Sequence, residues 1–187
     1  LPFQHGLPAM DSFPRDTWAR LLARRARQPQ SRLYDYQFGP GFPALREAIA
    51  AYLGAARGVV CGPDNVIVTA GAQAALDLAA RMTLDPGDPV WIEDPGYLGA
   101  RGALQSAGAN LIPVPVDKEG MNPDALPEGT KDPKLIYVSP SYQFPLGVTM
   151  SLNRRLALLE RAKETGAWIL EDDYDSEYRY KIGRAHV

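Results

Sequence analysis

Between Asn65 and Glu171, short apolar runs alternate with segments of helical periodicity, and this alternation constrains the fold more than any other feature of the chain. The pattern predicts strands at 65–69, 89–93, 110–115, 134–139 and 167–171. It predicts helices at 72–83, 97–106 and 151–165, with a polar excursion at 117–132. Apolar strands separated by helices of this length favour an α/β fold with a mostly parallel sheet, flanked by helices on both faces in three α/β/α layers.

Two further helices are predicted ahead of this alternation. The pattern at 15–27 places apolar residues on one side and arginines elsewhere, so we expect an amphipathic helix that packs as an arm. Pro43 opens the second helix, which Gly54 and Gly58 close. The segment 33–41 is rich in Tyr, Gly and Pro and predicts a loop between the two helices.

Composition narrows the class of protein. The 187 residues suffice for one buried core, so we expect one domain or part of a larger one. Twenty basic against 22 acidic residues leave a net charge of -2, which gives no field that attracts nucleic acid, so any DNA binding must come from elsewhere. The only cysteine, Cys61, excludes a disulfide framework and favours a reducing cytoplasm. No apolar run approaches the roughly 20 residues that cross a bilayer.

Both ends of the sequence predict a fragment. The chain starts at Leu1 without a methionine, and 181–187 carries no recognisable periodicity. We treat this last stretch as a non-native tail and give His186 within it no functional weight.

Ligands in open α/β sheets gather at the carboxyl ends of strands, so the segments that follow the predicted strands are the candidate site. These segments are 69–73, 93–97, 140–147 and 171–175. The first places backbone N–H groups at a helix start, where an anion could bind, although Gly71 could simply allow a tight turn.

The second and third segments each allow two interpretations. Tyr97 could stack on a flat heterocycle, or it could be a core tyrosine after a Pro-Gly turn. The segment 140–147 contains two prolines and a glycine, which suits a stiff pocket wall or a long turn.

The fourth segment crowds three carboxylates, Asp172, Asp173 and Asp175, at the end of a strand that we expect to be central and buried. Buried carboxylates need partners, and the protonated pyridine nitrogen of pyridoxal phosphate would be one. Magnesium or calcium is a rival partner, but no other acidic cluster or His supplies the remaining ligands, so no metal is predicted. A solvated helix start is a second rival.

Taken together, these segments resemble the fold type I pyridoxal-phosphate-dependent aminotransferases of class I/II. The resemblance is strongest to the aminotransferase-like domain of MocR-type GntR transcriptional regulators. It runs from about Phe3 to Tyr180 and rests on stretches at 35–36 with 41–46, 68–78, 91–101, 143–151 and 171–180. It implies a partial large domain of that fold at 33–180, preceded by an N-terminal arm and helix at 1–32.

Several residues take on cofactor roles by this resemblance. Asp172 looks like the carboxylate that pairs with the pyridinium nitrogen, and Tyr174 looks like the phenol that hydrogen-bonds the cofactor's 3′ oxygen. Tyr97 would stack on the ring. The backbone N–H groups of Ala72 and Gln73 would bind the phosphate.

The resemblance also implies a homodimer, because Tyr36 would reach the phosphate of a neighbouring subunit. Two positions depart from the family pattern. Tyr142 stands where such regulators usually carry a histidine before Gln143, and Phe144 stands where aspartate aminotransferases place an asparagine. Both departures leave the hydrogen bonding around the 3′ oxygen in doubt.

The lysine that would hold the cofactor covalently lies, by the resemblance, some three dozen residues beyond the aspartate motif and so past the chain end. None of the five lysines present follows a serine-rich strand end after Asp172; they are Lys118, Lys131, Lys134, Lys163 and Lys181. We therefore predict no catalytic residue and no transaminase activity in this polypeptide alone.

The resemblance supports two functions. In the first, the domain belongs to a regulator that senses pyridoxal phosphate or an amino-acid adduct, while an upstream winged helix reads DNA. In the second, it belongs to a free-standing aminotransferase that acts on an amino acid and a 2-oxo acid. The segments 171–180 and 18–27 favour the regulator. A nicotinamide enzyme fails because Gly39 and Gly41 follow no strand and lack the third glycine of that fingerprint.

Overall fold

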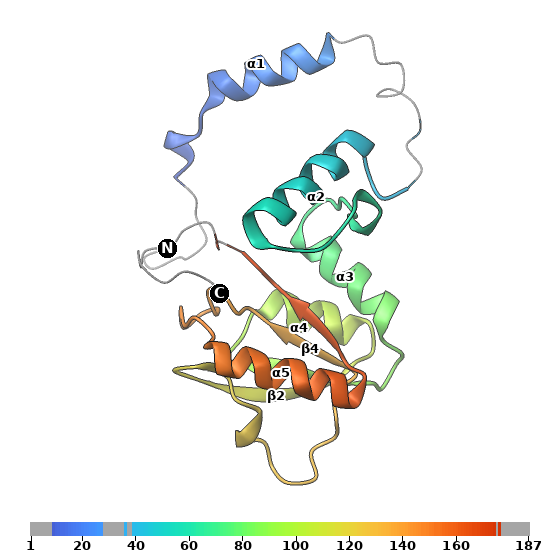
Figure 1. The fold of residues 1–187 in the computed structure, drawn as a ribbon, viewed down its shortest axis with the longest axis vertical. Helices are drawn as coiled ribbons and strands as arrows, with labels where there is room; N and C mark the ends of the chain where they lie inside the picture. Colours follow the sequence, from blue (N-terminus) through green and yellow to red (C-terminus); the bar gives the residue numbers. More distant parts are fainter. Residues whose placement is uncertain (1–8, 28–35, 37–38, 175, 177–187) are drawn as a thin grey trace. The chain divides into compact units, whose positions relative to one another are not determined.

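The computed structural model describes residues 9–27, 36, 39–174 and 176 (Figure 1). It divides the chain into two compact units, Leu1–Val68 and Thr69–Val187. The predicted tail at 181–187 lies outside the described residues, and the domain boundaries that we predict after residues 32 and 180 stay predictions.

The first unit contains the two helices predicted there. Helix α1 spans Arg15–Ala26 after a 3-10 turn, η1, at Met10–Ser12. Helix α2 spans Pro43–Arg57, with proline in its first turn, where a missing N–H costs nothing. It ends at Gly58, whose φ of 66° is the left-handed conformation that favours glycine, and the Gly58 N–H donates to the carbonyl of Gly54.

The strand predicted at 65–69 is wrong. A 3-10 turn, η3, occupies Pro63–Asn65, and 66–69 has no ladder partner among the described residues. The backbone binds inside the first unit instead: the Val68 N–H donates to the Pro40 carbonyl at 2.7 Å, and Arg46 Nε donates to the Val66 carbonyl at 2.9 Å. An extended apolar run becomes a strand only where a neighbouring strand lies beside it.

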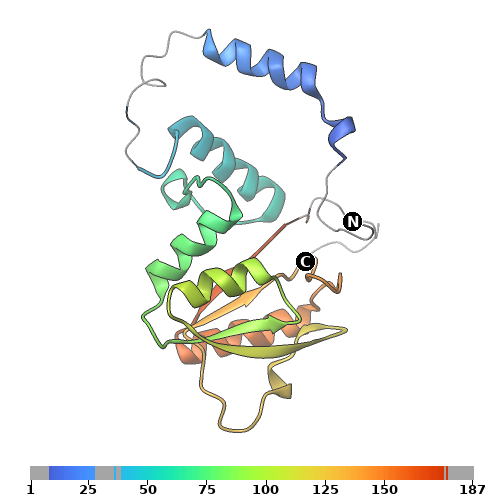
Figure 2. The same cartoon turned by 180° about the vertical axis from the view of Figure 1, so that it is seen from behind.

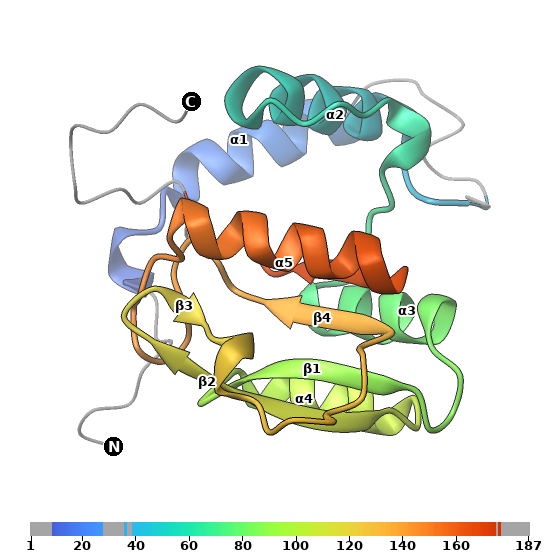
Figure 3. The same cartoon turned by 60° about the horizontal axis from the view of Figure 1, so that its bottom comes forward.

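A five-stranded sheet in the order β3-β2-β1-β4-β5 forms the centre of the second unit (Figure 3). Its strands are β1 (Pro89–Asp94), β2 (Asn110–Asp117), β3 (Gly120–Met121), β4 (Leu135–Val138) and β5 (Trp168–Glu171). All neighbouring pairs are parallel except β2 with β3, which are antiparallel. The mostly parallel sheet is confirmed, whereas β3 lies in the stretch predicted as a polar excursion, which also holds a 3-10 turn, η4 (Pro123–Ala125).

Three helices cover the two faces of this sheet, as predicted. They are α3 (Ala72–Thr83), α4 (Leu98–Ser106) and α5 (Leu152–Thr165). Alternate residues of β4 enter different cores: Leu135 and Tyr137 pack with α3 and α4, whereas Ile136 and Val138 pack with α5. Figure 2 shows α3 and α4 on the side of the strands opposite α5. Because both faces are covered, β4 is buried along its whole length.

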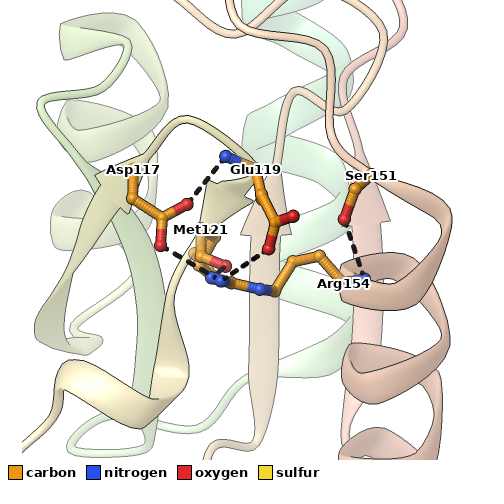
Figure 4. Close-up of polar contacts among 5 residues, drawn as sticks. All are labelled: Asp117, Glu119, Met121, Ser151 and Arg154. Atoms are coloured by element: carbon orange, nitrogen blue, oxygen red, sulfur yellow. Dashed lines mark hydrogen bonds and ion pairs between the residues drawn. The ribbon is translucent and has the colours of Figure 1, made fainter.

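An arginine ties the β2–β3 hairpin to the start of α5 (Figure 4). The Arg154 guanidinium donates to the Met121 carbonyl and, at 3.1 Å, to Asp117 Oδ2, and its Nη2 lies 3.8 Å from Glu119 Oε2. The Arg154 N–H donates to the Ser151 hydroxyl, which caps the helix. These contacts hold the first turn of α5 against the β2–β3 hairpin.

Candidate functional site

Three neighbouring parallel strands, β1, β4 and β5, end at the same edge of the sheet. The segments that follow them, 95–97, 139–150 and 172–174, therefore leave the sheet side by side. This is the edge at which open α/β sheets bind their ligands.

Asp172 follows β5 and is held by a buried tyrosine. The Tyr137 hydroxyl donates to Asp172 Oδ2 at 2.7 Å, and the Asp172 N–H extends the ladder to the Val138 carbonyl at 2.9 Å. Burial, and then the bond to Asp172, raise the pKa of Tyr137, so the phenol keeps its proton. Asp172 Oδ1 has no hydrogen-bond partner among the described residues, so one oxygen is oriented and the other is open.

The expectation that the strand before Asp172 is central and buried is wrong for the described part of the chain. There β5 pairs only with β4, and the Trp168 side chain is 61% exposed. Asp172 is accordingly half-buried rather than buried. Half-burial does not require Asp172 to have a charged partner, but its open oxygen is accessible to a ligand.

The neighbouring carboxylate serves a structural purpose. Asp173 accepts hydrogen bonds from the Ser141 hydroxyl at 2.7 Å and from the Ser176 hydroxyl at 2.9 Å. It therefore joins the segment after β4 to the segment after β5. Asp175, the third predicted carboxylate, lies outside the described residues.

Two aromatic pairs lie at this edge. The Tyr174 ring packs edge-on against Tyr142, with 6.3 Å between the ring centres. The Tyr97 ring packs edge-on against Phe144 at 6.0 Å, and it also covers Gly99, where an added Cβ would lie 2.4 Å from the ring. Each pair joins the segment after β4 to a neighbouring segment, and each includes one of the two tyrosines predicted to contact the cofactor.

The start of α3 is brought to the same place. Gln73 Nε2 donates to the carbonyl of Gly99 at 2.9 Å, beside the ring of Tyr97. The residue before the helix is Gly71, which has no side chain to cap the first turn. The backbone N–H groups of Ala72 and Gln73 have no acceptor within the helix, and both residues are exposed. An anion would satisfy these groups.

Tyr36 lies in the first unit, and its side chain is 86% exposed. The other predicted residues belong to the second unit, and the contact of Tyr36 with a neighbouring subunit stays a prediction.

A buried carboxyl group near the end of β1 was not among the predicted site residues. Glu93 is 0% exposed, and its Oε2 accepts from the Ser139 N–H at 3.2 Å and from Gln143 Nε2 at 3.3 Å. Glu93 Oε1 is buried with no partner in the described structure. Burial raises the pKa of Glu93, the Asp172 charge raises it further, and the bonds from Ser139 and Gln143 oppose both.

A signal for Glu93 was present in the sequence. It directly follows the apolar run 89–92 in a strand predicted to be central, so its burial could be expected. Its hydrogen bond from Gln143 could not be expected, because the loop that supplies Gln143 follows a different strand, 50 residues further along the chain.

Among the described residues, no group of three or more His, Cys, Asp and Glu side chains is placed to hold a metal ion. Within the same part of the chain, no helix is both long and apolar enough to cross a membrane.

Comparisons with known proteins show which family the chain is similar to. Residues 11–175 match the family model described as aminotransferase class I and II. A probable rhizopine catabolism regulatory protein, MocR, from Rhizobium meliloti is 50% identical over 97% of the chain, and a 2-aminoadipate transaminase from Thermus thermophilus is 37% identical over 92%. The crystal structure of LysN, an alpha-aminoadipate aminotransferase from the same species complexed with N-(5'-phosphopyridoxyl)-L-leucine, superposes over 91% of the chain with a TM-score of 0.80 at 36% identity.

The chain is shorter than each of these proteins. It spans 36% of the MocR protein, 43% of the transaminase and 43% of the LysN chain.

Proposed function

The chain belongs to the class I and II aminotransferase family, and on that basis we propose that it is the pyridoxal-phosphate-binding part of a MocR-type transcriptional regulator. The observation that carries the binding proposal is Asp172, which has one oxygen oriented by Tyr137 and the other open. Similarity to several proteins named as regulators, one of them 50% identical, supports the regulatory role.

The residues at the sheet edge fit this cofactor. A carboxylate with an open oxygen can accept a hydrogen bond from a protonated ring nitrogen and stabilise its charge. When bound, pyridoxal phosphate supplies an electron sink, which depends on that nitrogen keeping its proton. Because Asp172 is anchored by Tyr137 and by its own backbone bond, its position does not depend on the ligand.

The other predicted residues lie where they would support this role. The free N–H groups of Ala72 and Gln73 would receive the phosphate, and Tyr97, which is linked to Gln73 through Gly99, would stack on the ring. Tyr174 would donate to the 3′ oxygen. The edge-on packing of Tyr97 on Phe144 leaves that tyrosine oriented before any ligand arrives.

In the whole protein we propose that the domain senses pyridoxal phosphate or an amino-compound adduct, works as a homodimer in the cytoplasm and meets DNA through a winged helix upstream. The alternative is a free-standing aminotransferase, which the 37% identical transaminase supports. Reading the gene upstream of Leu1 separates the two: a winged-helix sequence supports the regulator, and a start codon directly before Leu1 supports the enzyme.

The binding proposal is tested by titrating pyridoxal phosphate into the longer protein that contains this chain and the downstream lysine, following absorbance or fluorescence. We expect Asp172→Asn, which keeps the shape but removes the charge, to weaken binding by about tenfold or more, since charge-assisted hydrogen bonds contribute about 1.5 kcal/mol or more.

Asp132→Asn is the matched control, because Asp132 is an exposed carboxylate paired with Arg161 and lies outside the site. Equal affinities for wild type and Asp172→Asn would refute the assignment of Asp172. Keto acid produced by the 187-residue polypeptide alone would refute the prediction that it is inactive.

A further inference from the structure

Glu93 is a fully buried acid with no cation beside it in the described structure. The titratable groups that act on it are Asp172 after β5 and Tyr137 on β4, and neither is positive. Its neighbour Asp94 is exposed and faces Arg101 at 3.5 Å, so the nearby arginine is engaged elsewhere. A charged carboxylate without a counter-ion in such a place is costly, whereas a neutral acid is not.

Glu93 holds a glutamine that organises the segment after β4. Besides Glu93 Oε2, Gln143 Nε2 contacts the carbonyls of Pro95 at 2.8 Å and Phe144 at 2.6 Å, and Gln143 Oε1 accepts from the Leu146 N–H at 3.1 Å. The Gln143 side chain is therefore the internal support of this loop. Glu93 also binds the loop's first residue through the Ser139 N–H.

This support lies directly behind the proposed cofactor contacts. Phe144, which follows Gln143, packs on the ring of Tyr97, and Tyr142, which precedes it, packs on Tyr174. A displacement of Gln143 would therefore move both aromatic pairs together.

We propose that Glu93 is a positioning residue of this site, which as an uncharged acid holds the loop at 139–147 and adds no negative charge beside Asp172. The proposal deepens the cofactor-binding function proposed above and rests on it. It gives Glu93 no contact with the ligand.

Two buried oxygens without partners lie near each other, and they can bind in either protonation state of Glu93. Glu93 Oε1 and the Ser139 hydroxyl both lack a hydrogen bond within the described structure, and the hydroxyl is close enough to lower the pKa of Glu93, against the larger effect of burial. The bond can run from the hydroxyl to a carboxylate or from a protonated Oε1 to the hydroxyl, so the uncharged form is supported by the full burial of Glu93 and the lack of a cation beside it in the described structure. The raised pKa of Glu93 agrees with that assignment.

The ionisation of Glu93 should weaken the site. A negative charge there would repel Asp172, and beyond the existing bonds from Ser139 and Gln143 it could gain stabilisation only by moving these groups or by admitting water. Glu93→Gln removes this ionisation while keeping a carbonyl oxygen for both donors and placing an amide N–H where the proton would sit.

The test measures the affinity of the longer, lysine-containing protein for pyridoxal phosphate from about pH 6 to about pH 9, for wild type, Glu93→Gln and Glu93→Ala. Because the ligand is the same for all three proteins, the ratio of their dissociation constants isolates the effect of residue 93. We expect wild type to weaken relative to Glu93→Gln as pH rises, and Glu93→Ala to bind about tenfold more weakly than Glu93→Gln throughout. Glu160→Gln, an exposed change on α5, is the matched control and should follow wild type.

A wild-type to Glu93→Gln ratio that stays constant with pH would overturn the proposal, as would a Glu93→Gln protein that binds as weakly as Glu93→Ala. Either result leaves the proposed function standing, because wild type would still bind. Loss of binding in wild type itself would overturn the proposed function and the positioning role together.

Discussion

Replacing Arg154 with alanine tests how the loop behind the site is fixed at its downstream end. The guanidinium side chain is only 11% exposed, and it joins the β2–β3 hairpin to the first turn of α5. The Met150 N–H donates to the Pro140 carbonyl, and the Ser151 N–H donates to the Glu119 carbonyl, so the same hairpin holds the end of the loop that Gln143 supports at its centre.

The expected loss follows from how well each partner is solvated. Met121 is fully buried, and removing a donor to its carbonyl costs about 1 to 3 kcal/mol. Asp117 and Glu119 have side chains 39% and 50% exposed, so water replaces the guanidinium and the two pairs together add less than about 1 kcal/mol. We therefore expect Arg154→Ala to lower the free energy of unfolding by about 1 to 4 kcal/mol.

Part of this difference should depend on pH. The backbone N–H of Glu119, followed by Arg154, holds the pKa of Asp117 below its ordinary value of 3.8. Because the folded-state pKa is the lower one, the stabilisation from Asp117 is present above 3.8 and is lost as the pH falls below it. The gap between wild type and Arg154→Ala should narrow in acid for the same reason.

Urea unfolding of the longer protein, followed by circular dichroism, measures the loss. Arg155→Ala is the matched control, because Arg155 is the next residue of the same helix, is 33% exposed and lies 3.8 Å from a half-exposed Glu171. We expect it to cost about 0.5 kcal/mol or less. Equal losses of unfolding free energy in the two variants would show that the bond to the buried Met121 carbonyl adds no stability, and would refute the reasoning.

Two further changes test the supports of the site. Tyr137→Phe fills the same volume but removes the donor to half-buried Asp172, so it should lower the free energy of unfolding by about 1 to 2 kcal/mol and weaken cofactor binding; an unchanged urea midpoint would contradict this. Gly96→Ala would place a Cβ 2.3 Å from the Glu93 carbonyl oxygen and should cost about 1 to 3 kcal/mol in thermal unfolding, whereas Gly102→Ala, with open space in the interior of α4, should stabilise by about 0.5 kcal/mol. Similar shifts for both glycines would refute the steric argument.

Local pattern was enough to predict most of the fold. The helices α3, α4 and α5 and the strands β1, β4 and β5 lie within one or two residues of their predicted bounds, because each carries its own periodicity and end signals. The failures are non-local. The two-residue strand β3 exists only because a hairpin turns back on β2, and the run at 66–68 has no neighbouring strand in the described sheet. Neither outcome can be predicted from the local residues alone.

The site divides in the same way. The rule that ligands gather at strand ends placed Asp172 and Tyr97 at one edge, and the structure brings them there with Gln73. The rule could not predict how deeply each of these carboxyl groups is buried. It predicted a buried Asp172 and overlooked Glu93, because burial at a strand end depends on which strands lie on either side and on which loop folds over it.

The position of each strand in the sheet explains why two carboxyl groups at one edge take different forms. Strand β1 has neighbours on both sides, so Glu93 at its end is closed off from water and is stable there only when uncharged. Strand β5 has one neighbour in the described sheet, so Asp172 after it stays half-exposed and keeps an open, charged oxygen. A carboxylate oxygen that binds a cationic ring must be charged and accessible, whereas a carboxyl group that supports a loop must be shielded from water. Exchanging the surroundings of the two residues would abolish both roles.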